Sequence, residues 1–143
     1  MMRHSATDHQ IAASDPGASV WVAASAGTGK THVLTDRVLR LLLSGSAPSQ
    51  ILCLTFTRAA AAEMANRLHR DLASWVILDD SGLQQALLGL TGRAATEAEM
   101  ELARRLFAQV LDSPGGLKIQ TIHAFCESLL SRFPLESNIP PHF

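Results

Sequence analysis

The stretch WVAASAGTGKTHVL, Trp21 to Leu34, places a glycine-rich loop between a short apolar run and an amphipathic one. The run SVWVAAS is rich in β-branched and aromatic residues, and it predicts a strand over residues 19–25. Residues 29–43 place apolar side chains at helical spacing, and SGSAPS ends the predicted helix. A strand, a glycine-rich turn and a helix in this order favour an α/β fold.

The loop between the two runs has the composition of a phosphate-binding loop. Glycines let the backbone approach phosphate oxygens, and a helix N-terminus attracts anions. Lys30 would reach the β and γ phosphates, and the Thr31 hydroxyl would ligate Mg²⁺. Ala24 replaces the usual first glycine with another small residue. The predicted phosphate and Mg²⁺ residues are Ala24, Ser25, Ala26, Gly27, Thr28, Gly29, Lys30 and Thr31.

The rest of the chain predicts further strands and helices. ILCLTF is almost wholly apolar, as expected of a strand buried on both faces, and Thr96 with Glu99 forms a capping box. These predicted elements are strands at 51–56 and 117–122 and helices at 59–78, 83–90, 96–110 and 123–133. The order predicts a parallel α/β sheet with flanking helices and a helical insertion at about 79–113. Three strands are few for such a sheet, so we expect part of a longer protein.

Composition narrows the class of protein. The net charge of −1 excludes a globally basic protein that coats nucleic acid, so contact with a polyanion would be local. Cys53 and Cys126 lie far apart in apolar runs, which favours two buried thiols in a reducing compartment. The chain shows no secretory or membrane-spanning stretch, and we expect a cytoplasmic protein without a membrane partner.

Two polar segments follow the second and third predicted strands. LTFTRAAAAEM begins at Leu54 and IQTIHAFC at Ile119. Carboxyl ends of parallel strands share one edge, so Thr55–Arg58, Thr121–His123 and the phosphate loop should lie along it. Hydroxyls and N–H groups suit the phosphates of a single strand, and an exposed ring suits a base. Alternatively, Phe56 is a core residue, His123 a capping residue and Arg58 a solvated one.

Together, AGTGKT, LTFTRAAAAEM and TIHAFC resemble, in this order, motifs I, Ia and Ib of the UvrD/Rep-type superfamily 1 helicases. The wording is closest to the helicase-nuclease subunits of bacterial double-strand-break repair. The resemblance runs from Gln10 to Phe143 and implies an incomplete first RecA-like lobe of a P-loop NTPase. The start of a next subdomain would lie at about 134–143.

The resemblance also implies roles. Gln10, twenty residues before Lys30, would read adenine, and ATP with Mg²⁺ would drive 3′–5′ translocation on single-stranded DNA. The partners would be single-stranded DNA, duplex ends and a second subunit in a heterodimer, and a nuclease would act in recombination. Arg58 and Ala59 replace an Asn-Lys pair that relatives often carry. The implied DNA contacts are Thr55, Phe56, Thr57, Arg58, Thr121 and His123.

An acidic pair follows the apolar run VIL at Asp79 and Asp80. It imitates the metal-binding motif II of this family, but it continues an alanine-rich helix and precedes motif Ib. We therefore interpret it as solvated punctuation and expect the chain alone not to hydrolyse ATP. Two other functions stay open at this point: a P-loop phosphotransferase acting on a small metabolite, and a non-catalytic remnant that binds DNA or a partner.

Overall fold

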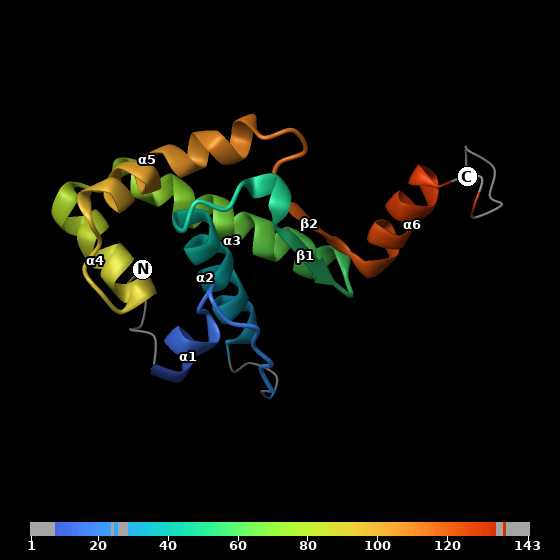
Figure 1. The fold of residues 1–143 in the computed structure, drawn as a ribbon, viewed down its shortest axis with the longest axis horizontal. Coiled ribbons are helices and arrows are strands. Elements are labelled where there is room, and N and C mark those ends of the chain that lie inside the picture. Colours follow the sequence, from blue (N-terminus) through green and yellow to red (C-terminus); the bar gives the residue numbers. More distant parts are fainter. Residues whose placement is uncertain (1–7, 24, 26–28, 134–135, 137–143) are drawn as a thin grey trace.

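The structure is a computed structural model that describes residues 8–23, 25, 29–133 and 136. The described elements follow one another from the N-terminal to the C-terminal side of the chain (Figure 1). They are α1 (Asp8–Ala13), α2 (Lys30–Leu43), a 3₁₀ turn (Pro48–Gln50), β1 (Leu52–Thr55), α3 (Arg58–Ile77), α4 (Asp80–Thr91), α5 (Glu97–Asp112), β2 (Lys118–Thr121) and α6 (Ile122–Arg132). None of the helices in these ranges combines the length and the apolarity that crossing a bilayer requires.

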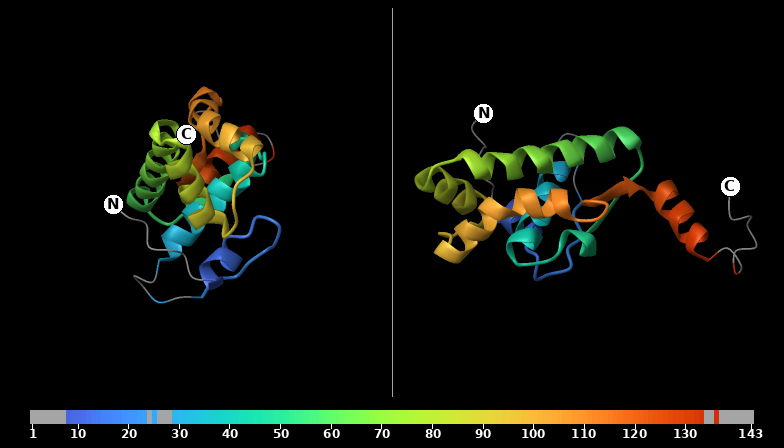
Figure 2. Two further views of the ribbon diagram at one scale, coloured as in Figure 1. Left: turned by 90° about the vertical axis from the view of Figure 1, so that its left-hand side faces the viewer. Right: turned by 90° about the horizontal axis from the view of Figure 1, so that it is seen from above.

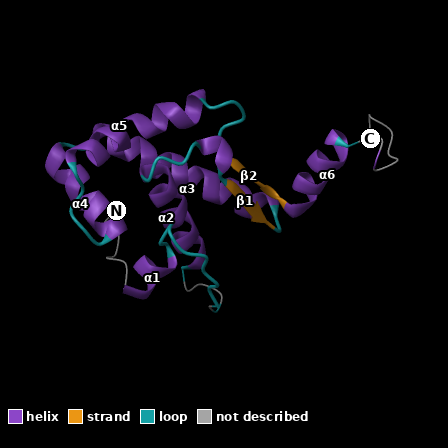
Figure 3. Ribbon diagram, in the orientation of Figure 1, coloured by secondary structure: helices purple, strands orange, loops and turns teal. Residues whose placement is uncertain are grey.

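The sheet contains two parallel strands within the described residues (Figure 3). β1 pairs with β2 in a register that sets Leu52 opposite Lys118 and Thr55 opposite Thr121. The connection runs through α3, α4 and α5, as a parallel pair requires a long crossover. The predicted strands at 51–56 and 117–122 are confirmed, each one residue shorter at both ends.

The strand predicted for residues 19–25 is wrong for the residues that the structure describes. Residues 19–23 and 25 belong to no strand, and Trp21 is 93% exposed. Val20 and Val22 are also exposed, although their side chains line a cavity of about 200 Å³ against α2. β propensity depends on context, because a strand needs a neighbour to pair its backbone. The described part of the sheet offers this segment none.

The hydrophobic core lies among the helices rather than under the sheet. α3 is the longest element, and its buried face is set by residues at helical spacing, with Trp75 only 2% exposed. α2, α4 and α5 pack against it, while Leu52 and Leu54 of β1 remain partly exposed. The fully buried core side chains include Leu39, Leu42, Leu68, Leu72, Trp75, Leu83, Leu87, Leu90, Leu106 and Val110.

α6 is attached differently from the other long helices. Figures 1 and 2 show it extending beyond β2, away from the packed helices. None of its residues is buried, so the expectation of a buried Cys126 is wrong, while Cys53 of β1 is half-buried. The core therefore fixes α2 to α5, and α6 is held through the end of the strand that leads into it.

The acidic pair Asp79 and Asp80 lies at a helix junction. Val76 and Ile77 are the end of α3, not a strand, so the interpretation of VILDD as an imitation of motif II agrees with the structure. The Asp79 carboxylate caps α4 by accepting from the Gly82 N–H at 2.7 Å. The sequence pattern predicted a turn here and a helix from 83, because the capping role of Asp79 was not recognised.

Arg104 ties this junction together from α5. Its guanidinium donates to the carbonyl of Leu78 at 2.9 Å and to that of Trp75 at 3.3 Å. It also pairs with the Asp80 carboxylate at 2.7 Å. Carbonyls at the C-terminal end of a helix lack intrahelical partners, so a cation there satisfies them and complements the helix dipole.

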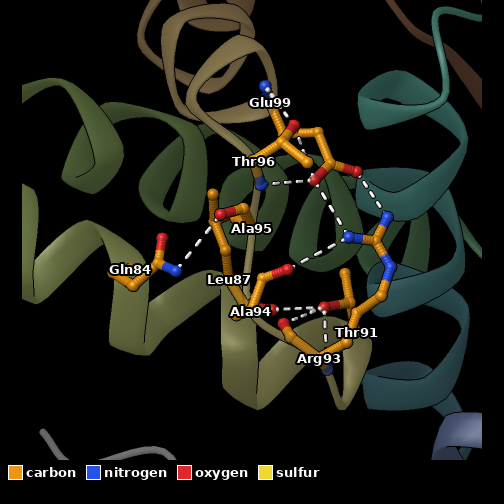
Figure 4. A network of polar contacts seen from close by, with 8 residues as sticks. All are labelled: Gln84, Leu87, Thr91, Arg93, Ala94, Ala95, Thr96 and Glu99. Carbon is orange, nitrogen blue, oxygen red and sulfur yellow. Dashed lines mark hydrogen bonds and ion pairs between the residues drawn. The ribbon is translucent and has the colours of Figure 1, made fainter.

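A polar network holds the connection between α4 and α5 (Figure 4). Thr96 accepts from the Glu99 N–H, and the Glu99 carboxylate accepts from the Thr96 N–H at 2.8 Å, which confirms the predicted capping box. Arg93 adds a two-pronged contact to the same carboxylate. The bond from Arg93 and the cap lower the pKa of Glu99 from 4.5 to about 2. Gln84 anchors the loop by donating to the Ala95 carbonyl at 3.2 Å.

The first prediction concerns Glu99→Gln. Removing the charge should lower the free energy of unfolding by about 1 kcal/mol at neutral pH, because a cap and a charged contact weaken. The lowered pKa means that the carboxylate stabilises the fold above pH 4.5 and loses this effect as the pH falls towards about 2. Urea unfolding of both proteins across this range should therefore show the difference shrinking in acid. Glu97→Gln, in the same helical turn, is the control, and a pH-independent difference would contradict the prediction.

The second prediction concerns Arg104→Ala. Truncation removes the donor to the α3 carbonyls and the partner of Asp80, so we expect a loss of about 1–3 kcal/mol in unfolding free energy. The neighbouring Arg105→Ala removes an exposed arginine of the same helix and should change stability by less than about 0.5 kcal/mol. Denaturant unfolding measures both. Equal effects of the two substitutions would rule out the junction role.

Candidate functional site

The start of α2 has the geometry expected of an anion site. Gly29 stands before the helix with φ 88°, a left-handed conformation that favours glycine. Lys30 is the first helical residue, and its ammonium group donates to the Ser25 carbonyl at 2.9 Å. Thr31 follows and is exposed. The predicted loop residues Ala24, Ala26, Gly27 and Thr28 lie outside the described residues.

α2 is anchored so that its N-terminal end stays open. Val33, Val38 and Leu39 are buried against the helical core, and Thr35 donates to the Thr31 carbonyl at 2.9 Å. Within the described residues, no side chain caps the first turn of α2. Its unpaired N–H groups and the helix dipole therefore face the loop, where a phosphate would be stabilised.

Gln10 lies beside this loop, on α1. A Cβ built on Gly29 would stand 3.7 Å from the Gln10 amide nitrogen. Residues 10 and 29, distant in sequence, are thus brought to one place, as the predicted site requires. The close approach also explains the glycine: a side chain at 29 would occupy the space between α1 and the helix start, and the φ value would strain it.

A second group of predicted residues follows β1. Thr55 ends the strand, and its hydroxyl donates to the Thr57 carbonyl at 2.9 Å. Thr57 caps α3 by accepting from the Ala60 N–H at 3.1 Å. Phe56 is 86% exposed, which excludes the alternative of a core residue in this chain. Arg58, the first residue of α3, is exposed as well.

The third group ends β2. Thr121 caps α6 by accepting from the Ala124 N–H at 3.2 Å, and His123 is exposed in the first turn of that helix. Since Thr121 pairs with Thr55 in the sheet, the two predicted nucleic-acid segments lie side by side at the carboxyl edge. This part of the predicted arrangement is present. That the phosphate loop shares the edge stays a prediction, because no described strand links α2 to the sheet.

The two threonine caps were missed in the sequence. Thr57 stands directly before an alanine-rich helix, which is a start signal that could have identified it. Because their hydroxyls accept from helix N–H groups, Thr57 and Thr121 orient α3 and α6 with both N-termini at the same edge. The edge therefore combines two positive helix ends with one exposed ring.

Comparison with known proteins places this geometry in a family. The sequence matches the family described as "UvrD/REP helicase N-terminal domain" over residues 5–143. No solved structure shows a significant match to the chain.

Individual relatives carry one name. The chain is 33% identical over 136 residues to the ATP-dependent helicase/nuclease subunit (AddA) of Lactobacillus acidophilus, covering 95% of this chain and 10% of that protein. It is 34% identical over 128 residues to the protein of that name from Streptococcus sanguinis, covering 89% and 9%. The corresponding values for the Levilactobacillus brevis protein are 35% over 127 residues, 89% and 9%. The chain thus spans about a tenth of the length of these curated relatives.

The family match covers nearly the whole chain, and its residues include the open start of α2 and the edge formed by β1 and β2. On this evidence the chain belongs to the UvrD/REP helicase N-terminal domain family.

Proposed function

We propose that this chain forms the nucleotide-binding and single-strand-contacting part of an ATP-dependent DNA helicase. The observation that carries the proposal is the parallel pairing of β1 with β2. It sets Thr55–Arg58 beside Thr121–His123 at one edge, in a chain whose family is a helicase family. A metabolite-directed phosphotransferase would have no use for an exposed Phe56 at that edge.

The start of α2 would hold the ATP phosphates. Gly29 leaves room for a close backbone approach, and Lys30 supplies the cation at the first helical turn. The Thr31 hydroxyl would ligate Mg²⁺, which when bound neutralises phosphate charge. Gln10, beside Gly29, would read the edge of the adenine. Residues 24 to 28 would complete the loop around the phosphates.

The edge of the sheet would hold the DNA strand. The N-termini of α3 and α6 offer backbone N–H groups and partial positive charge to two successive phosphates. The exposed ring of Phe56 would stack on a base, and Arg58 and His123 would contact the backbone. Thr55, Thr57 and Thr121 act mainly by fixing this edge, since their hydroxyls make local bonds.

In its full context, the chain would belong to a helicase-nuclease of the AddA type. We propose 3′–5′ translocation, an AddB-like partner in a heterodimer, duplex DNA ends as entry points, and a cytoplasmic role in recombinational break repair. Helices between 79 and 113 would form an insertion, and residues 134–143 would begin the next subdomain. The chain alone would not hydrolyse ATP, because Asp79 and Asp80 are used at the α3–α4 junction.

The third prediction tests the nucleotide site with Lys30→Ala. ATP affinity of the chain should fall about 10-fold or more, because a hydrogen bond to a charged group is lost. In a helicase that contains this chain, ATPase activity and unwinding should vanish while single-strand binding survives. Lys118→Ala removes the only other lysine of the sequence, which lies at the far end of β2, and serves as the control. Retained ATPase activity in the Lys30 variant would refute the proposal.

The fourth prediction tests the DNA edge with Phe56→Ala. Loss of stacking should weaken binding of a single-stranded oligonucleotide by about 1–3 kcal/mol, measured by fluorescence anisotropy. Thermal stability should change little, because the ring is exposed. Phe133→Ala, another exposed phenylalanine at the end of α6, is the matched control. Unchanged DNA affinity in the Phe56 variant would exclude a stacking role.

A further inference from the structure

α1 is held in place by polar contacts. It has only six residues and none of them is buried. A helix this short is unstable by itself, and no buried face fixes it. One apolar contact is evident at its middle, where Ile11 lies near Gly92 of the α4–α5 connection. The position of Gln10 must therefore depend strongly on whatever bonds hold α1.

Two arginines of α2 supply those bonds. Arg40 donates from one guanidinium nitrogen to the Ile11 carbonyl at 2.6 Å and to the Ser14 hydroxyl at 2.8 Å. Arg37, one turn earlier, donates to the carbonyls of Asp15 and Ala18. A guanidinium at the C-terminal end of a helix satisfies carbonyls that lack intrahelical partners.

Ser14 passes the contact of Arg40 on to Gln10. It is 1% exposed, and its hydroxyl donates to the Ile11 carbonyl at 3.1 Å. Its N–H donates to the Gln10 carbonyl at 3.0 Å. Arg40, Ser14 and the last turn of α1 thus form one bonded unit, with Gln10 in that turn. The same α2 carries Lys30 at its start.

From this we infer that Arg40, assisted by Arg37, is a positioning residue for purine recognition. It holds α1 so that Gln10 stays beside Gly29, and it thereby fixes the base-reading group to the helix that binds the phosphates. The inference rests on the proposed function, in which Gln10 reads adenine. It adds that selectivity for ATP over GTP depends on an arginine that touches no part of the nucleotide.

Titration calorimetry of the full chain with Mg·ATP and Mg·GTP tests the inference. Arg40→Ala should lower the ratio of ATP to GTP affinity about 2- to 10-fold, the effect of losing a hydrogen bond to the base. Gln10→Ala should lower it equally, and the double variant no further. GTP affinity should persist, because the phosphate grip at Lys30 remains. Arg40→Lys, which keeps a donor and the charge, should restore part of the ratio.

Arg104→Ala is the matched control, since it removes an arginine that caps another helix, α3. It should leave the ratio unchanged even where it lowers stability. An unchanged ratio in Arg40→Ala, or an equal loss of ATP and GTP affinity, would overturn the inference. A wild-type chain that binds neither nucleotide would instead refute the proposed function. Hydrogen exchange then decides the positioning role: faster exchange of the Ser14 amide in Arg40→Ala alone supports it, and unchanged exchange overturns it.

Discussion

Parallel pairing of β1 with β2 is the constraint on which the candidate DNA edge depends. Two strands that run the same way must end on the same side, and each here is followed at once by a threonine and a helix. The pairing of Thr55 with Thr121 therefore brings two helix N-termini together across 66 residues of sequence. Slipping this register would move every side chain of one strand to the other face and separate the segments.

The packing of the helices and the polar contacts of the site have different tasks. Leucines and Trp75 fix α2, α3, α4 and α5 as one body. The elements that carry Gln10 and His123 contribute no buried residue, so their positions follow from hydrogen bonds and from strand ends. Sites of this kind can move by small amounts without disturbing the core, which suits a protein whose ligands must be bound and released.

Much of the architecture could be predicted from local patterns. The leucine spacing of α5, the capping box at Thr96 and the apolar run before Thr55 each depend on residues within a few positions of one another. The same holds for the phosphate loop around Lys30. These features are readable because periodicity and caps act over one or two turns. Features that depend on distant partners were not predictable in this way. The run 19–25 has strand composition, but whether it pairs is decided by neighbours that the sequence does not reveal. Arg40 and Ile11 are separated by 29 positions, and nothing near either residue announces their contact.

The exposed flank of β1 has a consequence for handling the chain in solution. Within the described residues each strand has a neighbour on one side only, and Leu52 and Leu54 remain more than 40% exposed. Open strand borders with apolar side chains recruit further strands from other molecules. Concentrated samples should therefore grow by sheet addition, and Lys118, opposite Leu52, is the charge best placed to slow that growth.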